Sequence, residues 1–137
     1  MRDITDIKPV RPGTNLLAEF GRVFIKDDEI PRQPIHSASG VAFDSANVEV
    51  KLLMVGDRMH MLKVYFDKGT TVPVHQHDDH TTIVCLAEGK LQVNIGDETF
   101  TAEPGDVWQH PRGVPHNHTA LEDSHVIEIK APAVKTW

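Results

Sequence analysis

The sequence contains a single cysteine and no long run of apolar residues. Cys85 has no second thiol with which to form an internal disulfide, and this fits a protein of a reducing compartment. No stretch approaches the roughly 18 consecutive apolar residues that predict a membrane-spanning helix. The opening residues, MRDITDIKPVRPG, lack the apolar segment of a secretory signal. We therefore expect a cytoplasmic protein with no membrane partner.

Basic residues are also scarce. The 137 residues include 14 Lys and Arg against 20 Asp and Glu, which gives a formal net charge of −6. The basic residues form no cluster, so the composition speaks against a nucleic-acid-binding surface. A chain of this length is expected to form one domain around a single hydrophobic core.

Short β-like runs between turn signals fill the chain from about residue 40. The runs that predict strands are residues 47–55, 59–66, 81–89 and 124–132, together with a hairpin over 90–106 that turns at Gly96-Asp97. No long helical period interrupts them, which indicates an all-β sandwich or barrel over residues 41–137. Residues 1–40 are expected to form an irregular N-terminal arm, in which 15–24 is either a short helix or an extended segment.

Nine histidines are present, and six of them lie in two clusters. The clusters are His75, His77 and His80, then His110, His116 and His118. If His75 and His77 lie on one strand they face the same side, and two imidazoles can then converge on one ion. A third histidine must come from another strand, and His116, which follows the tight turn PRGVP, is the candidate.

The spacing around these histidines resembles the two motifs of the cupin family. The residues that match the first motif are Gly69, His75, His77 and Gly89, and those that match the second are Gly105, Pro111, Gly113 and His116. The 15 residues between the two motifs are similar to the short spacer of small microbial cupins. The resemblance covers roughly residues 48–130. It implies a double-stranded β-helix, or jelly roll, with one divalent transition metal ion (Fe, Mn, Ni or Zn) in the barrel mouth.

Thr82 departs from the pattern, because cupins usually place a metal-binding Glu there. A neutral hydroxyl is a weak ligand, so we expect a site of His75, His77 and His116 with its other positions open to water or substrate. The loss of one negative charge should favour anionic substrates. Thr82 is expected to face the cavity as a hydrogen-bond donor without ligating the ion, and a Glu introduced at position 82 is expected to tighten metal binding.

The remaining histidines of the two clusters have weaker assignments. His118 has the strand parity of His116, so it is expected to face the cavity; it is either a base or donor for the substrate or a satisfied core residue. With Thr82 it is a candidate catalytic residue. His80 is expected to be exposed in its loop or to lie behind the metal ligands, and His110 is expected to be structural.

What the resemblance implies about function is a metal-dependent enzyme acting on an anionic or carbonyl-containing small molecule. Dioxygenase and lyase or isomerase chemistry both remain open at this point. The alternative is a non-catalytic small-molecule-binding or sensor protein, although no DNA-binding segment accompanies the predicted barrel. Small cupins commonly pair through N-terminal strands, and the apolar residues within 15–30 are suited to this, so a homodimer is expected.

Overall fold

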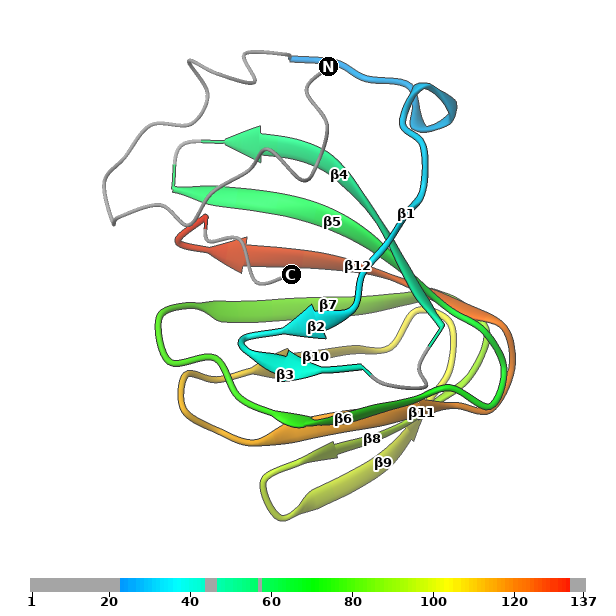
Figure 1. Ribbon diagram of the computed structural model, residues 1–137, viewed down its shortest axis with the longest axis vertical. Coiled ribbons are helices and arrows are strands. Elements are labelled where there is room, and N and C mark those ends of the chain that lie inside the picture. The colour runs from blue at the N-terminus through cyan, green and yellow to red at the C-terminus, as the bar shows by residue number, and fades with distance from the viewer. Residues whose placement is uncertain (1–22, 44–46, 57, 134–137) are drawn as a thin grey trace.

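The computed structural model describes residues 23–43, 47–56 and 58–133, and two antiparallel sheets that face each other form most of this part (Figure 1). In spatial order, the six-stranded sheet contains β1 (Gln33–Pro34), β4 (Val48–Gly56), β5 (Met59–Phe66), β12 (Ser124–Ala131), β7 (Thr81–Glu88) and β10 (Val107–His110). The four-stranded sheet contains β6 (Thr71–His75), β11 (His116–Ala120), β8 (Leu91–Ile95) and β9 (Glu98–Ala102). A short hairpin of β2 (Ser37–Ala38) and β3 (Val41–Ala42) completes the strands of the described residues. The predicted all-β jelly roll is confirmed.

The predicted strands agree closely with β4, β5, β7 and β12. The predicted hairpin is also present: Ile95 pairs with Glu98 across the turn, and Gly96 has a φ of +55°. Glycine adopts this left-handed conformation without the steric cost that a Cβ atom brings. Local turn chemistry and alternation were therefore sufficient to locate these elements.

The hydrophobic core fills the space between the two sheets. Inward-facing residues alternate with outward-facing ones along β5, where Leu62, Val64 and Phe66 are buried and Lys63 and Tyr65 face outward. The four-stranded sheet contributes fully buried apolar residues from β8. Burial of such side chains contributes roughly 25 cal/mol per Å² of apolar surface removed from water, which makes this the main stabilising term of the barrel.

Residues 23–34 of the N-terminal arm run along the six-stranded sheet. A 3-10 turn, η2 (Asp27–Glu29), places Asp27 against two lysines of β4 and β5, with Lys51 Nζ 3.3 Å and Lys63 Nζ 3.1 Å from its carboxylate oxygens. Ile30 is buried, and β1 then pairs with β4. Residues 15–22 of the expected pairing segment lie outside the described residues, so its role in dimerisation stays a prediction, as does the domain boundary at residue 40.

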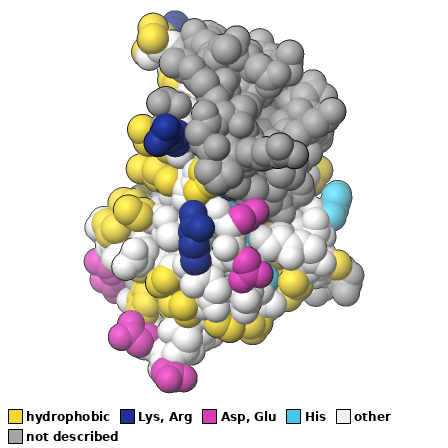
Figure 2. All heavy atoms as spheres, turned by 90° about the vertical axis from the view of Figure 1, so that its left-hand side faces the viewer, with side chains coloured by type: hydrophobic (Ala, Val, Ile, Leu, Met, Phe, Trp, Pro, Cys, Tyr) yellow, Lys and Arg dark blue, Asp and Glu magenta, His cyan; other side chains and the backbone are white. Residues whose placement is uncertain are grey.

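The outer face of β12, β7 and β10 carries exposed apolar side chains. Ile129 lies directly opposite Ile83 in the sheet, and the two are 38% and 51% exposed, while Val107 on β10 is 62% exposed. On the face of the molecule drawn in Figure 2, acidic and basic side chains are interspersed among hydrophobic ones. Over the described ranges, no helix has the length and hydropathy of a membrane span.

Candidate metal centre

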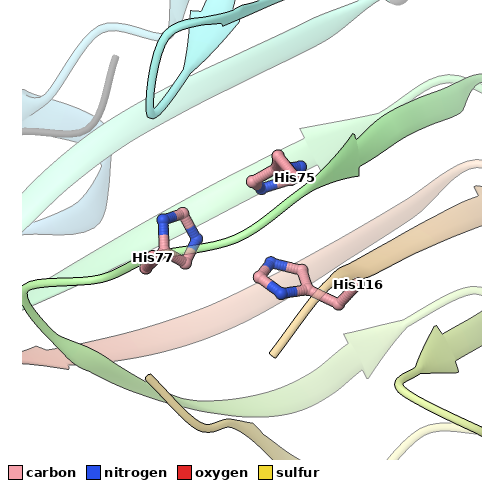
Figure 3. Close-up of side chains that lie close together, drawn as sticks. All are labelled: His75, His77 and His116. Carbon is pink, nitrogen blue, oxygen red and sulfur yellow. The ribbon is translucent and has the colours of Figure 1, made fainter. Parts of the chain in front are cut away.

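The structure brings His75, His77 and His116 together inside the barrel mouth. Their candidate ligand atoms all lie within 4.8 Å of one another, and their rings lie around a common space (Figure 3). His75 ends β6 and His116 begins β11, and the two residues pair directly in the four-stranded sheet. His77 reaches the site from the loop after β6 rather than from the strand itself, which differs from the expected placement.

Each of the three rings is oriented by a hydrogen bond at Nδ1. The partners are Pro73 O for His75 at 2.8 Å, Val114 O for His116 at 3.2 Å and Ser39 Oγ for His77 at 2.6 Å. A carbonyl oxygen accepts the Nδ1 proton and so leaves the Nε2 lone pair free. Such partners orient metal-binding histidines in known sites. The donor set therefore fits a divalent ion held by three imidazole nitrogens, with Nε2 left free on His75 and His116.

Burial also keeps these imidazoles neutral. It is the largest cause of the lowered pKa of all three residues, and it lowers the pKa of His116 to about 4. A neutral imidazole is the form that binds a metal ion, because its lone pair is then available. Three neutral nitrogen ligands suit iron, nickel or zinc.

Thr82 faces the interior, and its partner is a lysine. Thr82 is fully buried, and its Oγ1 accepts a hydrogen bond of 3.0 Å from Lys130 Nζ. Lys130 lies directly opposite Thr82 in the pairing of β12 with β7 and is 3% exposed. The buried amine contributes to the lowered pKa of His75, His77 and His116. Sequence reasoning did not single out Lys130.

Four inward-facing polar residues form a row across the six-stranded sheet. His60, Lys130, Thr82 and His110 are successive cross-strand neighbours on β5, β12, β7 and β10, and all four are buried. The next inward row, on the side away from the mouth, starts with Leu62 and continues through Glu128, Val84 and Trp108. The barrel interior is therefore polar at the end that holds the histidines and largely apolar beyond it.

His110 packs against one of the three central imidazoles. Its ring stacks on His116 with centroids 3.7 Å apart and an interplanar angle of 16°. Trp108 Nε1 donates a hydrogen bond of 3.1 Å to His110 Nε2, which fixes the ring. The structural role expected for His110 stays a prediction, and its position directly beside His116 was not predicted.

His80 is completely buried, so the expectation that it is exposed in its loop is wrong. Its Nδ1 lies 2.8 Å from the carboxylate of Asp79, and its ring centroid is 4.4 Å from that of His77. Within the described part of the chain, its Nε2 has no hydrogen-bond partner. It lies outside the group of three that fits a single ion, which agrees with the alternative that it stands behind the ligands.

His118 faces the barrel interior, as expected for a residue two positions after His116 on the same strand, and it lies deeper in the barrel. Its ring meets Phe66 edge to face at 4.5 Å, and neither ring nitrogen has a partner among the described residues. It lines a cavity of about 50 Å³ together with His75 and His77, Glu128 and Lys130, and a set of apolar side chains. This volume is enough for water or part of a small ligand. Glu128, like Lys130, was not found from the sequence.

Comparisons with known proteins agree with this architecture. The cupin domain family matches residues 62–129. The pectin degradation protein KdgF of Dickeya dadantii is 28% identical over 106 residues, which cover 77% of this chain and 87% of that protein.

Solved structures show the same likeness. KdgF from a Halomonas species has a TM-score of 0.70 at 27% identity, with 80% of this chain and 94% of that one covered. An RmlC-like cupin from Shewanella frigidimarina also has a TM-score of 0.70, at 21% identity, with 82% and 92% covered, and is similar in fold.

Proposed function

Because the chain belongs to the cupin superfamily, we propose that it is an enzyme whose His75, His77 and His116 hold one divalent metal ion beside a small-molecule pocket. The observation that carries this proposal is the convergence of three buried imidazoles, each oriented through Nδ1. A bound ion supplies a Lewis acid that polarises a substrate oxygen. The residues of the chain orient the substrate and exclude water around it.

The proposed substrate is a sugar acid. The likeness to a pectin degradation protein supports this. Pectin is built from galacturonate units, and each unit carries a carboxylate. The neutral Thr82 supports it independently, since a site without a carboxylate ligand favours an anionic substrate. Lyase or isomerase chemistry is proposed rather than dioxygenase chemistry, because rearrangement of a sugar acid requires no oxidant.

The test is metal analysis of protein purified without a polyhistidine tag, followed by assays on monomeric uronic acids. These are prepared from polygalacturonate by hydrolysis and by β-elimination. About one equivalent of metal and metal-dependent conversion of a uronic acid without oxygen uptake are expected. Substrate-dependent oxygen uptake would instead select the dioxygenase. Binding of a uronic acid without conversion would select the non-catalytic alternative.

We also propose that the protein is a homodimer. Exposed apolar side chains support this: Val23 and Phe24 in the arm, and Ile83 and Val107 on the outer face of the six-stranded sheet. Apolar patches of this kind commonly mark contact surfaces. Light scattering is expected to give twice the chain mass of 15.3 kDa, and Ile83→Asp is the variant expected to weaken the dimer if the sheet face takes part. A monomer mass for the wild type would contradict the proposal.

A further inference from the structure

Lys130 is a buried amine with spare hydrogen-bonding capacity. It is 3% exposed, and Thr82 Oγ1, at 3.0 Å, is its one hydrogen-bond acceptor among the described residues. An ammonium group has three N–H donors, so two are left without a protein acceptor. Burying a charged group is costly unless it is paired, so a lysine at this position is better accounted for by a bound partner than by the fold alone.

Lys130 also points into the cavity that borders the three histidines. It lines that cavity together with His75, His77 and His118. Its amine contributes to the lowered pKa of six imidazoles at this end of the barrel: His60, His75, His77, His80, His110 and His116. A group bound between the metal centre and β12 would therefore meet this amine.

The site carries an excess of positive charge, which favours the binding of an anion. A divalent ion on three neutral imidazoles brings two positive charges, and a protonated Lys130 brings a third. Burial lowers the pKa of the Lys130 amine, and a carboxylate bound beside it would raise that pKa again. Glu128, partly buried on the same cavity, supplies one negative charge. Asp79 is 65% exposed at its side chain and faces solvent beside His80. Two positive charges therefore stay uncompensated inside the barrel.

We propose that Lys130 binds the carboxylate of the substrate, with Thr82 holding the amine in position. The carboxylate then lies between the ion and the six-stranded sheet, and accepts the two N–H groups that the protein leaves free. Thr82 accepts from Lys130, so its own hydroxyl proton is left for a second oxygen of the ligand. This assignment rests on the proposed metal site, and it explains how a threonine and a lysine together select for an acid.

The experiment compares matched charged and neutral probes by calorimetry on metal-loaded protein. The pairs are D-galacturonate against D-galactose, and glycolate against ethylene glycol. The wild type is expected to prefer the acid of each pair. Lys130→Met should weaken binding of the acids by about 10- to 100-fold, as for loss of a hydrogen bond between charged groups, and leave the neutral probes and the metal content unchanged. Thr82→Val should cause a smaller loss.

Lys51→Met is the matched control, because Lys51 is also buried in the six-stranded sheet but pairs with Asp27 outside the cavity. It should bind all probes as the wild type does. Unchanged acid binding in Lys130→Met, loss of metal from that variant, or no acid preference in the wild type would each overturn the inference. Lysine-dependent binding of glycolate without binding of galacturonate would uphold it and reject the sugar acid as substrate.

Discussion

Lys130 Nζ donates a hydrogen bond of 3.0 Å to Thr82 Oγ1 in the interior of the barrel, directly across the pairing of β12 with β7. If position 82 held a glutamate, its longer side chain would extend toward the place that the Lys130 amine occupies. The two residues therefore act as a pair: the short threonine leaves room for the amine, and the amine gives the buried hydroxyl a partner. Four predictions follow from this pair and from the histidines around it.

The first prediction is that the pair reduces the stability of the metal-free protein. Replacing Lys130 with Met and Thr82 with Val keeps the volumes similar and removes both polar groups from the interior. The double variant should be more stable than the wild type by about 1 to 4 kcal/mol, since apolar replacements of buried charged groups are often stabilising. Urea denaturation of both metal-free proteins measures the difference.

Lys51→Met is the control for this prediction, and this substitution is expected to lower the stability of the protein instead of raising it. Lys51 Nζ donates to the backbone oxygen of Asp27 at 2.9 Å and lies 3.3 Å from its carboxylate, so its removal breaks an existing pair. A loss of about 1 kcal/mol is expected for this partly exposed contact. Destabilisation of the double variant at Lys130 and Thr82 would show that their contact is structural.

The second prediction concerns the metal ligands. His75→Ala combined with His77→Ala should abolish stoichiometric metal and leave the β fold, because one remaining imidazole cannot hold the ion in the site. Elemental analysis and far-UV circular dichroism measure the two properties. A protein with both His36 and His125 replaced by Ala should retain one full equivalent of metal, because neither residue belongs to the three-histidine group. Full metal retention after loss of His75 and His77 would reject the assigned site.

The third prediction is acid sensitivity of the metal-free protein. The pKa of His60 is lowered to about 3, mainly by burial and to a smaller extent by electrostatic interaction with Lys130 and His80. Between pH 6.5 and 3 the unfolded chain holds a proton at this residue that the folded chain does not, so stability falls as the pH drops. For one such group, the free energy of unfolding can fall by at most about 1.4 kcal/mol per pH unit. His118, with a pKa of about 3, acts in the same direction.

Urea midpoints measured from pH 7 to pH 4 test this effect. They should fall more gently in His60→Gln than in the wild type, because glutamine takes up no proton in this range. Parallel curves for the two proteins would contradict the assignment of the effect to His60.

The sequence predicted the fold, but it did not predict the polar row at the barrel mouth. Along β12, Ile127 and Ile129 alternate with Glu128 and Lys130, so alternation alone would bury the isoleucines. The structure instead buries Lys130 and leaves Ile129 38% exposed. The buried Val126 fixes the register of β12, and a strand cannot change faces within one regular run.

The three histidines could be assigned together because they lie in two motifs that recur in a family. The positions of His110 and Lys130 beside them could not be predicted, because no motif gives their contacts and these contacts are with other strands. The stacking of His110 on His116 joins β10 to β11 across the two sheets, and the hydrogen bond of Lys130 with Thr82 joins β12 to β7. Each contact depends on the register between strands that are distant in the sequence, and single-strand patterns carry no information on it.

The last prediction revises the expected effect of Thr82→Glu. From the sequence, a glutamate at position 82 should restore a fourth ligand and tighten metal binding. In the structure its carboxylate would face Lys130 Nζ, which already lies at hydrogen-bond distance from the side chain at this position. An ammonium and a carboxylate in contact in the interior form a strong charge-assisted pair. The carboxylate is then held by Lys130 and is withheld from the ion.

Metal affinity should therefore change little in Thr82→Glu and rise by about tenfold or more when Lys130→Met is added, because the freed carboxylate then brings a negative charge to the ion. Competition with a chelator measures both affinities. Thr82→Gln with Lys130→Met is the control, since it has nearly the same shape without the charge, and it should gain less. If Thr82→Glu alone tightens binding as much as the double variant does, Lys130 does not compete for the carboxylate, and the pairing of the two residues has no influence on the metal.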